Sequence, residues 1–218
     1  MPVAFTPRDS ELVEAVRVAL ANLDADAELR DAVEPYGVNK PFRDDGQTRL
    51  VTAQGCINVS QHADGAQISS TAGVVSLKDD VTKGYTGLSE LARAAFRGQP
   101  GKLAALGIVG RAPSRLADLL ERGNKLFSAV KSDPDLAAGY QSVGQTAVKL
   151  AAIEEKFTEL GALAAAQEAK KGAAQQATAE CRAALEELRI WWGNAKRLAR
   201  VALRGKPQLL EKIGVRAR

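Results

Sequence analysis

The sequence has few of the residues that most often carry chemistry. It contains one histidine, His62, and two cysteines, Cys56 and Cys181, in 218 residues. A single histidine makes a Ser-His-Asp triad barely available and excludes a di-iron bundle built on two Glu-x-x-His pairs. We therefore expect no catalytic, cofactor or metal site. His62 is interpreted as a solvated residue and the two cysteines as small core residues.

Aromatic residues and long apolar runs are also scarce. Aromatics make up 5% of the chain, while hydrophobic residues as a whole make up 45%. With abundant alanine, this composition favours close-packed helices over a β-sandwich. No stretch approaches the twenty apolar residues of a membrane span, and the opening residues MPVAFTPRDSELVEAV lack the pattern of a signal peptide. Two cysteines form no disulfide framework, so we expect a cytoplasmic protein without a membrane span.

The most informative feature is an internal repeat. The stretch LARAAFRGQPGKLAALGI begins at Leu91, and LARVALRGKPQLLEKIGV begins at Leu198. They agree at nine of eighteen positions, and the same spacing of 107 residues continues without a gap from about residue 26 to the C-terminus. Such self-similarity predicts a tandem duplication of a helical unit. We expect two repeats, 1–107 and 108–218, that share one core.

The repeated letters are typical of helix ends. In RGQP and RGKP, Gly98 and Gly205 can adopt the left-handed conformation that ends a helix. Pro100 and Pro207 suit the first turn of a following short helix. The residues from Gly98 to Lys102 also match part of the sequence motif of a phosphate-binding loop. Phe96 replaces the first glycine of that motif, so we interpret the stretch as a corner.

A helical pattern of unusual length precedes the second corner. A helical spacing of three or four positions runs from Leu150 to Ala202, mostly through apolar residues, and keeps its phase across Gly172 although its middle positions are polar or small. We favour one helix over about 145–204, with a hairpin at Lys170-Lys171-Gly172 as the alternative. Residues 9–23, capped by Asp9 or Ser10, and residues 116–130 predict an opening helix in each repeat, followed by a short second helix.

Residues 48–77 give conflicting signals. They are rich in Val, Ile, Thr and Ser and contain an Asp-Gly pair, which is typical of β-strands. At the register of the repeat, however, they continue the helical apolar pattern through Leu50, Ala53 and Ile57. We predict helix, because tertiary context overrides propensity. The fold class is then all-α, with long antiparallel helices forming a bundle and short helices at its ends. Tyr85 and Trp192 are predicted core residues.

Charge is the one asymmetric feature. Residues 1–107 hold 11 basic and 14 acidic side chains, whereas residues 108–218 hold 19 and 12. A basic stripe on the last long helix is a candidate surface for anions or a partner, and the adjacent Trp191 is a candidate exposed contact. The alternative is an ordinary solvated face near a helix C-terminus. The basic stripe comprises Arg189, Lys196, Arg197, Arg200 and Arg204.

Two segments carry a resemblance at family level. LARVALRGKPQLLEKIG and AAQEAKKGAAQQATAE resemble parts of uncharacterised bacterial helical-bundle proteins of unknown function. The resemblance covers mainly the second repeat. It implies a bacterial, helical protein and no activity.

These observations favour a non-enzymatic helical scaffold or protein-interaction module, with a protein partner or self-association. The alternative is a nucleic-acid or anionic-surface binder that acts through the basic C-terminal helix. A third hypothesis, an enzyme of unspecified class, would need a concave pocket with converging polar groups.

Overall fold

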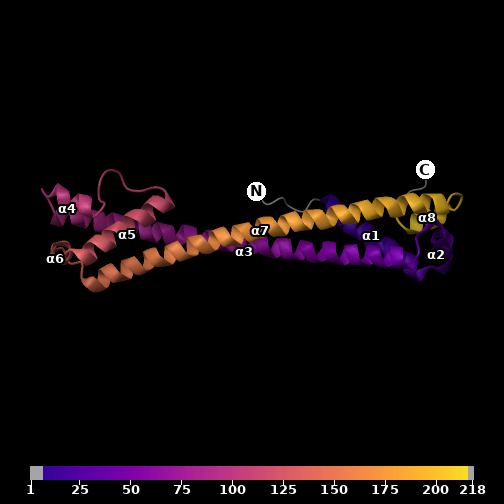
Figure 1. Cartoon of the computed structure of the whole chain (residues 1–218), viewed down its shortest axis with the longest axis horizontal. Coiled ribbons are helices and arrows are strands. Elements are labelled where there is room, and N and C mark those ends of the chain that lie inside the picture. The colour runs from indigo at the N-terminus through magenta and orange to yellow at the C-terminus, as the bar shows by residue number, and fades with distance from the viewer. Residues whose placement is uncertain (1–6, 216–218) are drawn as a thin grey trace. The chain divides into compact units, whose positions relative to one another are not determined.

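The protein is all-α (Figure 1). A computed structural model describes residues 7–215. Two helices of 56 residues each, α3 (Lys40–Ala95) and α7 (Ala147–Ala202), account for about half of the chain. The shorter elements are α1 (Pro7–Ala25), α2 (Ala27–Val33), the 3-10 helix η1 (Glu34–Tyr36), α4 (Pro100–Ala105), α5 (Leu116–Ser132), α6 (Pro134–Ser142) and α8 (Pro207–Lys212).

The helices form two compact units, each with its own apolar core. Unit 1 contains residues 7–65 and 172–215, so it combines α1, α2, the first part of α3, the last part of α7, and α8. Unit 2 contains residues 66–171, with the rest of α3 and α7 and with α4, α5 and α6 between them. The predicted repeats 1–107 and 108–218 divide the chain by sequence similarity instead, and that division stays a prediction.

Within each unit the segments of α3 and α7 run antiparallel (Figure 1). In unit 1, Arg49 pairs with Glu187, and further along α3 Ser60 lies opposite Thr178. In unit 2, the Gln167 amide donates a hydrogen bond to Thr71. Residue numbers therefore rise on α3 as they fall on α7, as the sequence predicted for the long helices.

The structure decides both sequence ambiguities. Residues 48–77 are helical throughout, within α3, which confirms the prediction of helix over strand. Residues 147–202 form one helix that continues through Gly172, so the hairpin alternative is wrong. In both regions the buried residues follow helical spacing. On α3 they include Leu50, Ala53, Val74, Val81, Tyr85, Leu88 and Ala92, and on α7 they include Leu150, Phe157, Leu160, Ala174, Cys181, Leu185, Leu188, Trp192, Ala195 and Ala199.

The corners have the predicted conformation. Gly98 and Gly205, which follow the two long helices, have φ angles of 79° and 91°. This left-handed region is open to glycine at little cost, so the chain can reverse there. Pro100 and Pro207 are the first residues of α4 and α8, as expected from their fixed φ. The stretch from Gly98 to Lys102 is therefore a corner.

The helix bounds recur at the spacing found in the sequence. α7 begins and ends 107 residues after α3, and α8 begins and ends 107 residues after α4. Asp26 and Asp133, also 107 residues apart, each cap the following short helix with a carboxylate that accepts a backbone N–H. The expected cap of the first helix is wrong, because α1 already begins at Pro7 and Asp9 and Ser10 lie inside it.

Unit 1 is built around two tryptophans on α7. Trp191 and Trp192 are 5% and 6% exposed, and their rings stack with centroids 6.4 Å apart. The burial of Trp192 confirms its prediction as a core residue. Around them lie buried residues of α1, α2, α3, α7 and α8, including Val16, Leu20, Leu23, Leu29, Val33, Leu50, Leu188, Leu203 and Ile213.

Unit 2 has an aromatic core. The Phe157 ring on α7 meets Tyr85 of α3 and Phe127 of α5 edge-on, at centroid distances of 6.4 and 5.4 Å. Tyr85 is 3% exposed, which confirms it as a core residue. Tyr140 of α6 is fully buried, and its hydroxyl donates to the Leu88 carbonyl at 3.2 Å. Burial raises the pKa of Tyr140 far above its ordinary value, so the donor stays protonated.

Exchanging Gly46 or Gly55 for alanine should change the stability of unit 1 in opposite directions. An alanine Cβ at 46 would lie 2.1 Å from the Trp191 ring, whereas a Cβ at 55 meets no atom within 4 Å. We expect Gly46→Ala to lower the free energy of unfolding by about 1–3 kcal/mol through overpacking. Gly55→Ala should raise it by about 0.5–1 kcal/mol through helix propensity.

Both variants can be followed by urea unfolding with tryptophan fluorescence. Trp191 and Trp192 are the only tryptophans of the chain, so the signal reports unit 1. Equal stabilisation by both substitutions would contradict the packing of Trp191 on Gly46.

Candidate partner-binding surface

The last part of α7 has one buried and one exposed side. Leu188, Trp192, Ala195 and Ala199 are buried at spacings of three or four residues, which orients the other side of this helical segment toward solvent. Four members of the basic stripe lie on this segment, and Arg204 lies in the turn that follows it. The five basic side chains differ in what they contact.

Arg189 is held by carboxylates of unit 1. Its guanidinium pairs with Asp9 of α1 at 3.1 Å and with Glu186 one turn earlier on α7. Lys196 is half-buried, and its ammonium group lies 5.5 Å from the centroid of the Trp192 ring in a cation–π contact. Both residues therefore already have partners within the fold, and the charge that they offer to a ligand is reduced.

Arg197, Arg200 and Arg204 are exposed and have no carboxylate partner among residues 7–215. Within the described part of the chain, the one side-chain hydrogen bond of these three arginines is donated by Arg197 to the Asn194 amide oxygen, at 3.5 Å. Two large apolar residues, Ile190 and Val201, are 58% and 55% exposed. We call these five residues the arginine face.

The arginine face is continuous along the helix. Ile190, Arg197 and Val201 recur at spacings of seven and four residues, which places them on one side of α7. Arg200 lies beside them, and Arg204 follows just past the end of the helix. The surface thus combines three guanidinium groups with two β-branched apolar side chains.

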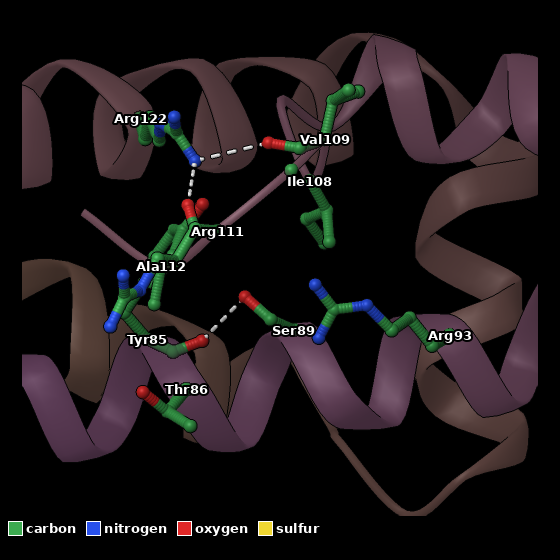
Figure 2. A pocket seen from close by; sticks show the side chains of 10 residues that line it. Tyr85, Thr86, Ser89, Arg93, Ile108, Val109, Arg111, Ala112 and Arg122 are labelled. Atoms are coloured by element: carbon green, nitrogen blue, oxygen red, sulfur yellow. Dashed lines mark hydrogen bonds between the residues drawn. The ribbon is translucent and has the colours of Figure 1, made fainter.

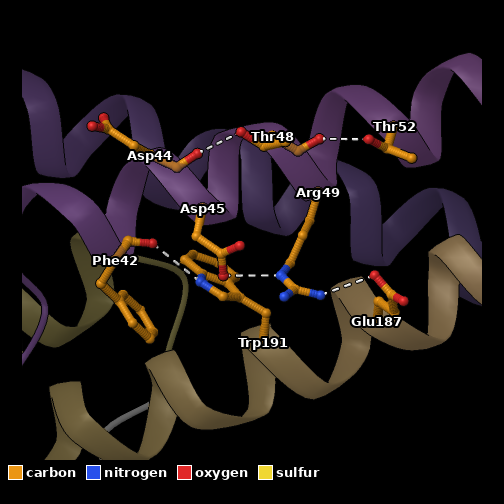
Figure 3. A network of polar contacts seen from close by, with 8 residues as sticks. All are labelled: Phe42, Asp44, Asp45, Thr48, Arg49, Thr52, Glu187 and Trp191. Atoms are coloured by element: carbon orange, nitrogen blue, oxygen red, sulfur yellow. Dashed lines mark hydrogen bonds and ion pairs between the residues drawn. The ribbon is translucent and has the colours of Figure 1, made fainter.

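The expectation that Trp191 is exposed is wrong. Its ring stacks on Phe42 with centroids 5.1 Å apart, and its indole N–H donates to the Phe42 carbonyl at 3.2 Å (Figure 3). Gly46 provides the room, because its missing Cβ lets the ring approach the α3 backbone. The signal for this contact in the sequence is Gly46, which lies one helical turn after Phe42. The sequence alone does not show which aromatic ring packs against this glycine.

A network that the sequence analysis missed lies beside Trp191 (Figure 3). Arg49 of α3 bonds Asp45 one turn earlier at 2.9 Å and reaches across to Glu187 of α7 at 3.0 Å. The hydrogen bond to Asp45 raises the pKa of Arg49, and both carboxylates add to the effect. These ion pairs connect α3 to α7 within unit 1, and we assign them a structural role rather than a catalytic one.

The residues with nucleophilic or metal-binding side chains are dispersed. His62 is exposed on α3, as predicted. Cys181 is buried in the core of unit 1, Cys56 is half-buried at its edge, and both are free thiols, which confirms the prediction of core packing. Burial raises the pKa of Cys181, so the thiol form is favoured. Within residues 7–215, no group of His, Cys, Asp or Glu side chains could hold a metal ion.

An apolar hollow of about 240 Å³ lies in unit 2 between α5, α6 and α7. Its lining includes Phe127, Val130 and Leu150, and the Lys131–Glu154 ion pair lies at its edge. The residue 107 positions before Leu150 is Arg43, whose buried guanidinium donates to the Val38 carbonyl at 2.9 Å in unit 1. Leu150 has a shorter side chain than Arg43, which is consistent with an open hollow beside it. The lining of the hollow is mostly apolar.

Comparison with known protein families, with curated proteins and with solved structures finds no match. The resemblance to uncharacterised bacterial helical proteins accordingly stays a prediction. No helix within residues 7–215 is both long enough and apolar enough to cross a membrane.

Removing the three free arginines should leave the fold intact. The triple substitution Arg197→Gln, Arg200→Gln and Arg204→Gln breaks no ion pair among the described residues, so we expect a change within about 0.5 kcal/mol per site. Arg189→Gln, which removes the bonds to Asp9 and Glu186, should cost up to about 1 kcal/mol. Urea unfolding followed by tryptophan fluorescence measures both, and a larger loss in the triple variant would reveal a structural role for the arginine face.

Proposed function

We propose that the protein is a non-enzymatic helical scaffold whose arginine face binds an acidic, partly apolar surface of a partner protein. The observation that carries the proposal is a set of three exposed guanidinium groups that have no carboxylate partner among residues 7–215 and that lie beside exposed Ile190 and Val201. Arginine is enriched in protein interfaces and in their binding hot spots. Isolated exposed apolar residues are ordinary, but here two lie within a charged surface that is itself unpaired.

The distribution of charge favours a local protein contact over a nucleic-acid footprint. The described part of unit 1 contains 14 basic and 15 acidic side chains, because the acidic start of the chain and its basic end belong to one compact body. Ion pairs join the two, including Lys206 with Glu28 and Lys212 with Asp26. A nucleic-acid surface needs several phosphate contacts from a basic patch. Unit 1 instead offers a small group of three neighbouring arginines, Arg197, Arg200 and Arg204.

We further propose that the chain arose by tandem duplication and that the arginine face specialised after it. The recurrence of helix bounds at a spacing of 107 residues supports this origin. The positions 107 residues before Ile190, Arg197 and Val201 hold Lys83, Glu90 and Ala94. The positions 107 residues before Arg200 and Arg204 hold Arg93 and Arg97, so the first repeat keeps two of the arginines but lacks the third arginine and both apolar side chains.

The proposal predicts a partner that depends on the arginine face. The immobilised chain should retain a defined protein from a nuclease-treated lysate of the source organism, and the Arg197→Gln/Arg200→Gln/Arg204→Gln variant should retain at least tenfold less of it. A matched control is Lys156→Gln/Lys170→Gln/Lys171→Gln, which removes the same charge from exposed positions elsewhere on α7. The control should bind as the wild type does. Titration of the purified partner then checks that its binding has the same dependence.

A second measurement separates the alternatives. With DNA or RNA in a gel-shift titration at about 50 mM salt, we expect no retardation at micromolar protein. Retardation that disappears near 200 mM salt and in the triple arginine variant would overturn the proposal in favour of nucleic-acid binding. Sedimentation of the purified chain distinguishes self-association, which would make a second copy of the chain the partner.

A further inference from the structure

A small cavity in unit 2 collects three arginines from three different elements (Figure 2). Arg93 comes from the last turn of α3, Arg111 from the loop between α4 and α5, and Arg122 from α5. The cavity measures about 30 Å³, and no acidic side chain is among its described lining residues. Arg93 and Arg111 are exposed, so the cavity is open to solvent on their side. This site is separate from the arginine face, which belongs to unit 1.

The walls of the cavity are held in place by hydrogen bonds. One terminal nitrogen of Arg122 donates to the carbonyl oxygens of Val109 and Arg111, at 3.2 and 2.9 Å, and so holds the loop over α5 (Figure 2). Ser89, which is 5% exposed, donates to the Tyr85 carbonyl at 2.8 Å from the floor of the cavity. Arg93 has no hydrogen-bond or ion-pair partner among the described residues. Its N–H donors are thus available to a ligand.

We propose that this cavity binds a tetrahedral oxyanion, namely phosphate or the phosphate group of a monoester. Guanidinium groups match phosphate oxygens in geometry and charge, and charge-assisted hydrogen bonds of this kind are stronger than neutral ones. The Ser89 hydroxyl can rotate from the Tyr85 carbonyl and donate to the anion as well. The volume suits one small group rather than a nucleotide, since a single water needs about 10–15 Å³ by such a measure.

The lining of the cavity gathers positive charge with no carboxylate beside it. Among the described residues, Arg93, Arg111 and Arg122 have no ion-pair partner, and the described lining contains no acidic side chain. An anion bound there would reduce the repulsion between the guanidinium groups.

The site is specific to unit 2. The residues 107 positions away from Arg122 and Ser89 are Ala15 and Lys196, and the Lys196 ammonium group lies over the Trp192 ring. Unit 1 therefore lacks the residue that fastens the loop and the buried hydroxyl, and it serves as an internal negative control.

Titration of the ¹⁵N-labelled protein with inorganic phosphate, at constant ionic strength, tests the proposal. Saturable shifts should appear at the amides of Ser89, Gly110 and Arg122, with none at the corresponding positions of unit 1. Arg93→Gln should weaken binding at least tenfold, and Arg111→Gln should also weaken it. Arg97→Gln, an exposed residue outside the cavity with the same charge change, should alter the affinity less than twofold. None of these substitutions removes the Arg122 bonds that hold the loop.

A parallel titration with phenyl phosphate distinguishes the sources of the ligand. Tighter binding of the monoester assigns the site to a phosphate group on a larger molecule, and equal or weaker binding assigns it to free phosphate. Shifts that do not saturate up to about 50 mM phosphate, or equal losses in Arg93→Gln and Arg97→Gln, would overturn the proposal, since either result indicates only general charge screening.

Discussion

The packing of α3 against α7 is the constraint on which both cores depend. Each helix carries one narrow row of buried residues, and many of these are small, among them Ala53, Ala92, Ala174 and Ala199. A helix of 56 residues gains little from propensity alone and needs such a row to be covered along its length. The facing helix covers part of the row in each unit, and the short helices α1, α2 and α8 or α4, α5 and α6 cover the rest. The corner glycines and capping aspartates matter because they return these short helices to the row.

Three aromatic side chains lie directly against helix glycines that are distant in the sequence; two of the rings are on α7, and Phe96 is in the turn after α3. Trp191 lies against Gly46 in unit 1, and in unit 2 Phe157 lies against Gly123 and Phe96 against Gly139. An added Cβ would approach each ring to about 2.1 or 2.2 Å, so the glycines set how deeply the rings are buried. These contacts join residues that are distant in sequence. At these three positions the packing accounts for a glycine inside a helix, where propensity alone would favour alanine.

Local features of the fold were predictable, and pairwise contacts were not. The corners at Gly98 and Gly205 follow from neighbouring residues, and the length of α3 and α7 follows from their helical apolar spacing. The β-like composition of residues 48–77 misleads because Val51, Val59, Ile68 and Val75 lie on exposed sides of α3. Threonines in this helix bond their hydroxyls to carbonyls four residues earlier, as Thr48, Thr52 and Thr71 do. The position of Trp191 depended on Gly46, about 145 residues away, and no local pattern indicates it.

The candidate site could be predicted only in part, because the sequence does not show which acidic side chains the fold places next to the basic ones. The excess of basic residues in 108–218 suggested a basic stripe of five, but the fold brings the acidic residues of the first helices beside it. Arg189 meets Asp9, and Lys206 and Lys212 meet Glu28 and Asp26. Arg197, Arg200 and Arg204 remain exposed and without a carboxylate partner among residues 7–215, which only the folded structure reveals. The described part of unit 2 has 14 basic and 11 acidic side chains, and three of those arginines converge on one cavity. Ion pairs within the fold thus neutralise part of the basic stripe, and the two candidate sites are places where several arginines without a carboxylate partner among residues 7–215 lie near one another: Arg197–Arg204 and the cavity beside Arg93.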